Sequence, residues 1–276
     1  MTRMRPGEWI LRYLSLALAL VIAVGPFLWL LSTAMRSPDE SVFSFPLRLL
    51  PEHPTFANFV TVWNSQPFGR YFANSALVAV ISVTLNVTFA SLAAYPLARM
   101  EFRGRNIVLW ILIGSMMVPF QLLLIPVFEL ATMMGLQNSY LGLILPHATT
   151  AFGVFFMRQA FLGIPAALEE VALIEGVNRF RIWWHVMLPL VKPSMATLAI
   201  FSFIASWGDF LWPLVLIDQP GMFTLPLGVN RLAGTFSLDW RLVAAGTVMS
   251  IVPILVFFAA TQRLFIAGAM KGAVKG

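Results

Sequence analysis

The sequence contains no cysteine, three histidines and few charges, and these scarcities exclude several kinds of protein. Without cysteine, disulfide bonds, thiol catalysis and cysteine-ligated metal sites are excluded. The phosphate-binding pattern GxxxxGK[ST] and the zinc pattern HExxH are also missing, and the histidines (His53, His147 and His185) are far apart along the chain. We therefore expect no catalytic residue, no metal and no cofactor on this chain itself.

Charged residues make up 11% of the 276 residues and hydrophobic residues 59%, whereas a soluble domain has about 25% charged residues. The hydrophobic residues gather in six runs, each about 20 residues long, which is the length of a membrane-spanning helix. These runs cover residues 13–34, 71–97, 107–132, 140–161, 194–217 and 242–265. We expect an all-α integral membrane protein with six transmembrane helices.

The first run follows Arg3, Arg5 and Arg12, and a secretory signal peptide also begins with positive charge. The apolar core of a signal peptide has only about 7–15 residues and leads to a small-x-small cleavage pattern. This run is longer and no such pattern follows it, so we interpret it as the first transmembrane helix.

Prolines and polar residues interrupt the apolar pattern at several places. Residues 36–70 are rich in proline and are predicted to form an outer loop without a long helix, in which the lone histidine is solvated. Pro119 and Pro126 are expected to break the third run. Residues 135–139 are expected to form a tight turn, and residues 218–241 a second outer loop.

If successive loops alternate between the two sides of the membrane, the positive charges are distributed unevenly. Thirteen of the 18 Lys and Arg residues then fall on the side that holds both termini. Because cytoplasmic loops carry such an excess, both termini are predicted to be cytoplasmic, and the net charge of +6 requires no nucleic acid partner. The inner residues are Arg3, Arg5, Arg12, Arg99, Arg103, Arg105, Arg158, Arg179, Arg181, Lys192, Arg263, Lys271 and Lys275, and the outer ones are Arg36, Arg48, Arg70, Arg231 and Arg241.

The stretch from Pro165 to Pro193 is a polar segment between the fourth and fifth apolar runs. Glu169 and Glu170 lie in the first turn after Pro165, where carboxylates stabilise the positive end of a helix. Gly176 is expected to end this helix in the left-handed conformation that glycine adopts without strain. One face of the helix is expected to carry Leu168, Val171, Ala172 and Glu175.

Asn178 is expected to cap a second short helix, which Pro189 would end. The apolar stripe of that helix would consist of Phe180, Trp183, Trp184 and Met187. Two short helices with apolar stripes predict an element that docks on a partner, although a solvated helix ended by Gly176 is the simpler alternative.

Residues 170–177 read EVALIEGV, and Leu188-Pro189-Leu190 and Pro193 follow. This pattern resembles the cytoplasmic coupling loop of ABC importer permeases, which reads E-A-A-x-x-D-G-A and later L-P-L-x-x-P. It departs from that signature at Val171, Val177 and Glu175. The resemblance implies that the loop docks on an ATPase, with His185 at the interface and with the coupling residues Glu169, Glu170, Ala172, Glu175, Gly176 and Phe180.

Residues 207–213, WGDFLWP, look like the stretch W-N-[DE]-[FY]-L-W-P of the carbohydrate (MalG-like) branch of these permeases, with Gly208 in place of asparagine. Residues 268–276 also look like the end of that branch. The resemblance implies a first helix and outer loop over residues 1–70 and a permease domain over residues 71–265, with its coupling loop at 165–193. A cytoplasmic tail follows over residues 266–276, and both disorder and contact with the ATPase remain open for it.

The resemblance further implies one multi-pass permease of a type I importer in the inner (plasma) membrane. Its partners would be a second permease subunit, a dimer of ATPase subunits that use ATP and Mg²⁺, an external solute-binding protein and membrane lipid. The substrate would be a sugar, an oligosaccharide or a glycoside, while glycerol phosphate and related polar solutes remain open.

Two carboxylates fall inside apolar runs, where an acidic residue costs about 2.5–3.5 kcal/mol. Glu129 would face either the substrate pathway or the headgroups. Asp209 would offer both its carboxylate and its own backbone carbonyl, which stays free because Pro213 has no N–H to bond it. Because Trp207 and Trp212 flank it, this site suits a hydroxyl-rich sugar; alternatively, the carboxylate holds a kink or bonds to the second permease.

Two other classes of membrane protein are less consistent with the sequence. A secondary transporter would show internal repeats and ion-binding carboxylates in several helices, and neither is evident in the chain. A membrane enzyme would need clustered catalytic groups, whereas the titratable residues are scattered. His147, in the fourth run, is expected to be packed or hydrogen-bonded.

Overall fold

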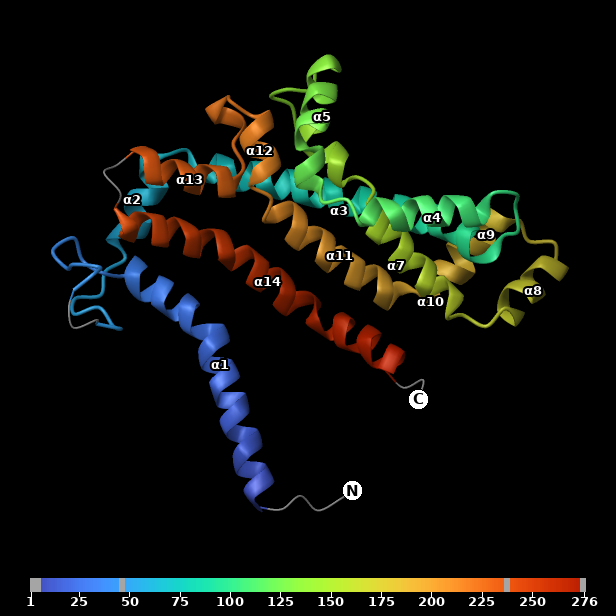
Figure 1. The fold of residues 1–276 in the computed structure, drawn as a ribbon, viewed down its shortest axis with the longest axis horizontal. Coiled ribbons are helices and arrows are strands. Elements are labelled where there is room, and N and C mark those ends of the chain that lie inside the picture. Colours follow the sequence, from blue (N-terminus) through green and yellow to red (C-terminus); the bar gives the residue numbers. More distant parts are fainter. Residues whose placement is uncertain (1–5, 45–47, 236–238, 274–276) are drawn as a thin grey trace. The chain divides into compact units, whose positions relative to one another are not determined.

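The computed structural model describes residues 6–44, 48–235 and 239–273, and every regular element within these ranges is a helix (Figure 1). The prediction of an all-α protein is therefore confirmed. The backbone forms two compact units, which are described separately. Unit 1 comprises residues 1–68 and 228–252, and unit 2 comprises residues 69–227 and 253–276.

Three helices in the described ranges are long and apolar enough to cross a membrane, at Leu11–Ala34, Phe68–Arg99 and Trp240–Gln262. Three pairs of helices meet the same criterion but are bent, so these ranges contain up to six spans if each pair counts as one. Each of the six predicted runs contributes to one of them. The pairs are Arg105–Met116 with Phe120–Met133, Tyr140–His147 with Ala151–Leu162, and Arg179–Leu190 with Lys192–Trp207.

Unit 1 contains α1 (Pro6–Ala34), α2 (Ala57–Ser65) and parts of α13 (Leu225–Thr235) and α14 (Trp240–Ala273), two helices that continue in unit 2. The proline-rich stretch after α1 is a loop, as predicted, although it leads into the short helix α2 before residue 70. Beyond the predicted end of the sixth run, α14 continues as a helix to Ala273, and residues 274–276 of the predicted tail lie outside the described ranges.

The loop that follows α1 is built around the buried side chain of Arg36. Its guanidinium donates hydrogen bonds to the carbonyl of Ser41, at 2.9 Å, and to that of Arg48. Asn58 on α2 donates to the carbonyls of Ala34, at 2.8 Å, and Arg36, at 2.7 Å. The bond to Ala34, the last residue of α1, satisfies a carbonyl that the end of a helix leaves without an intrahelical partner.

A second loop of unit 1 is ordered by Arg241. Its side chain donates to Asp239, at 2.9 Å, and to the carbonyl of Ser37, at 2.8 Å. The hydrogen bond from the Arg241 side chain lowers the pKa of Asp239. Residues 38–43 and 239–242 enclose an open cavity of about 580 Å³.

Unit 2 begins with α3 (Phe68–Arg99), which is followed by α4 (Arg105–Met116) and α5 (Phe120–Met133). The axes of α4 and α5 differ by 103°, so the third run is sharply bent. Pro119, extended at φ −60° and ψ 135°, lies at this break as predicted. The predicted break at Pro126 is wrong: this proline lies inside α5, because it removes only one hydrogen bond and need not end a membrane helix.

The fourth run folds as α6 (Tyr140–Ile144), the 3₁₀ turn η1 (Leu145–His147) and α7 (Ala151–Leu162). The axes of these two helical segments differ by 43°. The hydroxyl of Thr150 accepts a hydrogen bond from the amide of Gly153 at 3.0 Å and so caps α7. The tight turn before α6 forms as predicted, with Gly135 at φ 70°.

The coupling segment contains α8 (Ala167–Ile174), α9 (Arg179–Ile182), the π-helical turn η2 (Trp183–Met187) and α10 (Leu188–Leu190). This helical segment ends at Leu190, one residue after the predicted end at Pro189, and its axis differs by 80° from that of α11 (Lys192–Trp207). Within η2 the amide of Leu188 bonds to the carbonyl of Trp183, so the wider π turn ends immediately before the proline. The chain continues through α12 (Leu211–Leu216) and the 3₁₀ turn η3 (Pro220–Met222).

The core of unit 2 lies between α3, α7, the coupling segment and α11. Small residues of α3, such as Ala90 and Ala94, let the neighbouring helices approach closely. The amide of Asn86 links the same helices, since it donates to the hydroxyl of Ser202 on α11 at 2.7 Å and accepts from the amide of Thr150, before α7, at 2.9 Å. The coupling segment therefore packs directly on membrane helices of its own chain.

Candidate functional site

The coupling hairpin, defined here as α8, the turn after it, α9 and η2, forms largely as predicted. Gly176 adopts φ +77°, the left-handed conformation expected at the end of α8. The amide of Val177 donates to the carbonyl of Ala172 at 3.0 Å, which completes the cap. Asn178 caps α9, since its side chain accepts a hydrogen bond from the amide of Arg181 at 2.9 Å.

The predicted apolar stripes divide between two faces of the hairpin. In the first stripe only Ala172 is buried, whereas Leu168, Val171 and Glu175 are exposed. In the second, Trp183 and Met187 are buried in the core, and Phe180 and Trp184 are exposed. We use the name outer face for the exposed apolar side chains of the hairpin. They are Leu168, Val171, Ile174, Phe180 and Trp184.

The two adjacent glutamates of α8 differ in burial. Glu170 is exposed on the outer face, together with Glu175 and Gly176. Glu169 is only 5% exposed, and its carboxylate lies against the interior of its own chain. A carboxylate in this position requires cationic and hydrogen-bonding partners, because an unpaired buried charge is costly.

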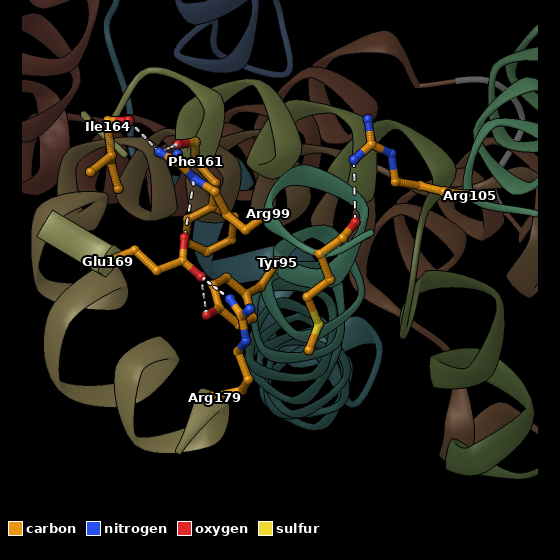
Figure 2. A network of polar contacts seen from close by, with 8 residues as sticks. Tyr95, Arg99, Arg105, Phe161, Ile164, Glu169 and Arg179 are labelled. Carbon is orange, nitrogen blue, oxygen red and sulfur yellow. Dashed lines mark hydrogen bonds and ion pairs between the residues drawn. The ribbon is translucent and has the colours of Figure 1, made fainter. Parts of the chain in front are cut away.

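Glu169 has three such partners (Figure 2). Its Oε1 accepts hydrogen bonds from the hydroxyl of Tyr95 at 2.7 Å and from Nη1 of Arg179 at 2.6 Å. Its Oε2 lies 3.8 Å from Nε of Arg99. The carboxylate therefore joins α3, α8 and α9. From the sequence, Arg99 and Arg179 are predicted only to belong to the basic inner side.

Arginines also join the ends of α3 and α7. Arg99, the last residue of α3, donates to the carbonyl of Phe161 at 2.5 Å and to that of Ile164. Nε of Arg158, on α7, donates to the carbonyl of Leu97 on α3 at 3.1 Å. Each helix thus supplies a cation to the carbonyl end of the other, where the helix dipole is negative.

Asp209 lies between α11 and α12, outside any helix. Its Oδ2 lies 2.9 Å from Nε2 of His147, and its Oδ1 accepts a hydrogen bond from the amide of Trp212 at 3.3 Å. Pro213 lies in the first turn of α12, where an N–H would have no intrahelical acceptor, and the free carbonyl predicted at Asp209 stays a prediction. The structural alternative for Asp209, holding a kink, matches this geometry.

The tryptophans on either side of Asp209 are buried in the core. The Trp212 side chain is 1% exposed, and its indole N–H donates to the carbonyl of Gly142 at 2.9 Å. Trp207 stacks on Phe203, with ring centroids 5.4 Å apart. Trp207 also meets Phe72 of α3, with ring centroids 5.5 Å apart, so both rings pack within this chain, and their part in a sugar site stays a prediction.

The remaining predicted site residues are placed as follows. Glu129 is exposed on α5. His185 is exposed, with Nδ1 3.3 Å from the carbonyl of Arg181. In the described parts of the chain, no three His, Asp or Glu side chains lie close enough to hold a metal ion.

The fold and the hairpin define a class of protein, a polytopic membrane subunit with an exposed hairpin that packs on its own membrane helices. The chain belongs to the family described as "binding-protein-dependent transport system inner membrane component", whose model matches residues 86–265. It is thus a permease subunit of an ABC importer, an inner membrane component that is not itself catalytic.

Relatives match over almost the whole length. The arabinooligosaccharides transport system permease protein AraQ of Halalkalibacterium halodurans is 36% identical over 98% of this chain and 97% of its own. The sulfoquinovosyl glycerol transport system permease protein SmoH of Agrobacterium fabrum is 32% identical over 96% and 94%. A chain in the crystal structure of a bacterial ABC transporter that imports the acidic polysaccharide alginate superposes with a TM-score of 0.83, at 25% identity over 96% of this chain and 99% of that chain.

Proposed function

We propose that this chain imports a sugar, an oligosaccharide or a glycoside, as one permease of a heterodimer. The names of the relatives support this substrate class, since AraQ and SmoH transport an oligosaccharide and a glycoside. The solute would arrive on an external binding protein and leave to the cytoplasm by alternating access.

The coupling of transport to ATP would occur at the outer face of the hairpin. The observation that supports this most directly is its exposed apolar surface, where Ile174 is 87% exposed beside the exposed carboxylates of Glu170 and Glu175. An exposed apolar group with a charged rim is typical of a docking surface. We propose that the dimer of ATPase subunits, which uses ATP and Mg²⁺, binds here, and that both termini lie on the same cytoplasmic side.

For the substrate pathway we propose a structural role for Asp209, Trp207 and Trp212, which would maintain the break between α11 and α12. Glu129 stays a candidate for direct contact with the solute, because its side chain is exposed on the bent third span. Exposure at the lipid headgroups is the alternative for Glu129.

The test is purification of the complex from host membranes through a tag on this chain. A second permease and an ATPase should copurify, and the cognate binding protein should carry a saccharide that mass spectrometry identifies. If the binding protein carries a glycerol phosphate, the substrate is a polar solute of that kind and not a sugar. Uptake that a protonophore abolishes, and that ATP depletion leaves intact, would instead indicate a secondary transporter.

A further inference from the structure

We propose that Glu169 is a positioning residue that transmits movement of the coupling hairpin to the membrane helices α3 and α7. This inference rests on the proposed docking of an ATPase on the hairpin. It assigns to Glu169 a role that differs from contact with the ATPase, and it separates Glu169 from its neighbour Glu170.

Three segments of the chain meet at the carboxylate of Glu169 (Figure 2). Tyr95 and Arg99 belong to α3, and Arg179 begins α9, while Glu169 itself lies on α8. Oε1 is held from two sides, at 2.7 Å by the Tyr95 hydroxyl and at 2.6 Å by the Arg179 guanidinium. Both helices of the hairpin are therefore fixed to α3 through a single group.

Arg99 extends the contacts of Glu169 to α7. Arg99 donates to the carbonyls of Phe161, in the last turn of α7, and of Ile164, two residues beyond its end. Its guanidinium thus lies between the end of α7 and Oε2 of Glu169, 3.8 Å from its Nε. A displacement of α8 that moves the carboxylate therefore moves the negative charge that is paired with Arg99.

The charge of Glu169 is not needed to attach the hairpin to the core. Apolar packing already joins the hairpin to the core, since Ala172, Ile182 and Trp183 belong to the same buried cluster as Phe161. A buried ion pair adds little net stability compared with apolar packing. Charge-assisted hydrogen bonds do impose a defined geometry, so the network is suited to fixing the orientation of the hairpin.

The experiment uses the whole importer, reconstituted in lipid with its partner subunits, and the cognate binding protein as isolated from the host with its bound solute. For Glu169→Gln we expect ATPase subunits to copurify in normal amount and basal ATP hydrolysis to persist. Stimulation of hydrolysis by the binding protein should fall by about tenfold, which is within the range of coupling between two sites. Transport should fall with it.

Two further variants make this result specific. Glu101→Gln removes an exposed carboxylate from the turn just after α3 and should leave stimulation unchanged. Tyr95→Phe removes a single hydrogen bond to Glu169 and keeps the ring in the core, so it should reduce stimulation by a smaller factor.

Wild-type stimulation in Glu169→Gln would overturn the inference. So would a variant that assembles in lower amount but shows normal stimulation per assembled complex, because Glu169 would then be needed only for folding. If Glu169→Gln gives no complex, Tyr95→Phe decides, and normal stimulation in that variant overturns the inference. Failure of the wild-type chain to bind any ATPase would instead refute the proposed function.

Discussion

Nε2 of His147 lies 2.9 Å from Oδ2 of Asp209 and so joins the fourth apolar run to the break between α11 and α12. Both side chains are partly buried, with 24% and 18% of their surface exposed. A buried hydrogen-bonded pair of this kind restrains two segments that are distant in the sequence. Removal of either partner leaves the other polar group without its bond, at a cost of about 1–3 kcal/mol.

This pair makes a structural role for Asp209 testable. Asp209→Asn should lower the thermal stability of the complex and change the apparent affinity for the solute little. Because both residues act through one contact, the double variant with His147→Gln should lose little more stability than either single variant. Melting temperatures and transport assays would measure this, and additive losses together with a strongly altered solute affinity would favour direct contact with the substrate.

The left-handed turn of the hairpin predicts a specific pattern at Gly176. Nothing lies within 4 Å of a Cβ added there, so any effect of substitution comes from φ +77°. Gly176→Val should strain the turn by about 1–2 kcal/mol and uncouple transport, whereas Gly176→Asn should be tolerated because asparagine adopts this conformation more readily.

Gly114→Val is the matched control for this turn. Gly114 lies in α4, where a Cβ also has open space and φ is helical. The three variants are compared by ATPase copurification and transport. Normal transport in Gly176→Val, or an equal loss in Gly114→Val, would show that the backbone conformation of Gly176 is not required.

The proposed docking surface predicts that Ile174 contributes to binding and not to folding. Because its side chain is 87% exposed, Ile174→Ala should leave the stability of the chain nearly unchanged. It should weaken retention of the ATPase by about tenfold, the effect of about 1.4 kcal/mol of lost apolar contact. Met133→Ala, at a side chain of α5 that is 84% exposed, is the control. Equal retention in both variants would contradict docking at this face.

The absence of cysteine makes the proposed topology directly testable. Asn230→Cys and Phe45→Cys should react with an impermeant thiol reagent on intact cells, because both positions lie in predicted outer loops. Arg103→Cys, in the predicted inner turn after α3, should react only after permeabilisation. The opposite pattern would place the termini outside.

Local patterns explain how much of the fold could be predicted. The apolar runs reflect the length that crosses a membrane, and the turn at Gly176 and the cap at Asn178 depend on residues one to three positions away. The break expected at Pro126 does not form, because whether a proline ends a helix depends on what satisfies the freed carbonyl.

The candidate site was predicted only in part, since a residue's spacing does not show which way it faces. Glu169 and Glu170 are adjacent in one helix, and nothing local distinguishes a carboxylate that meets Arg99 from one that meets a partner protein. Trp212 is close to Asp209 in the sequence, which suggests a sugar site, whereas its indole N–H donates to the carbonyl of Gly142, 70 residues earlier.

The sequence by itself determined that this chain is a helical membrane permease with a hairpin between its fourth and fifth apolar runs, because hydrophobic length, turn glycines and caps act over short distances. Only the tertiary structure decided that Glu169 serves its own chain, that His147 holds Asp209 and that the apolar stripes of the hairpin divide between core and surface. Each of these depends on contacts between helices far apart in the sequence, where packing selects one face of a helix over another.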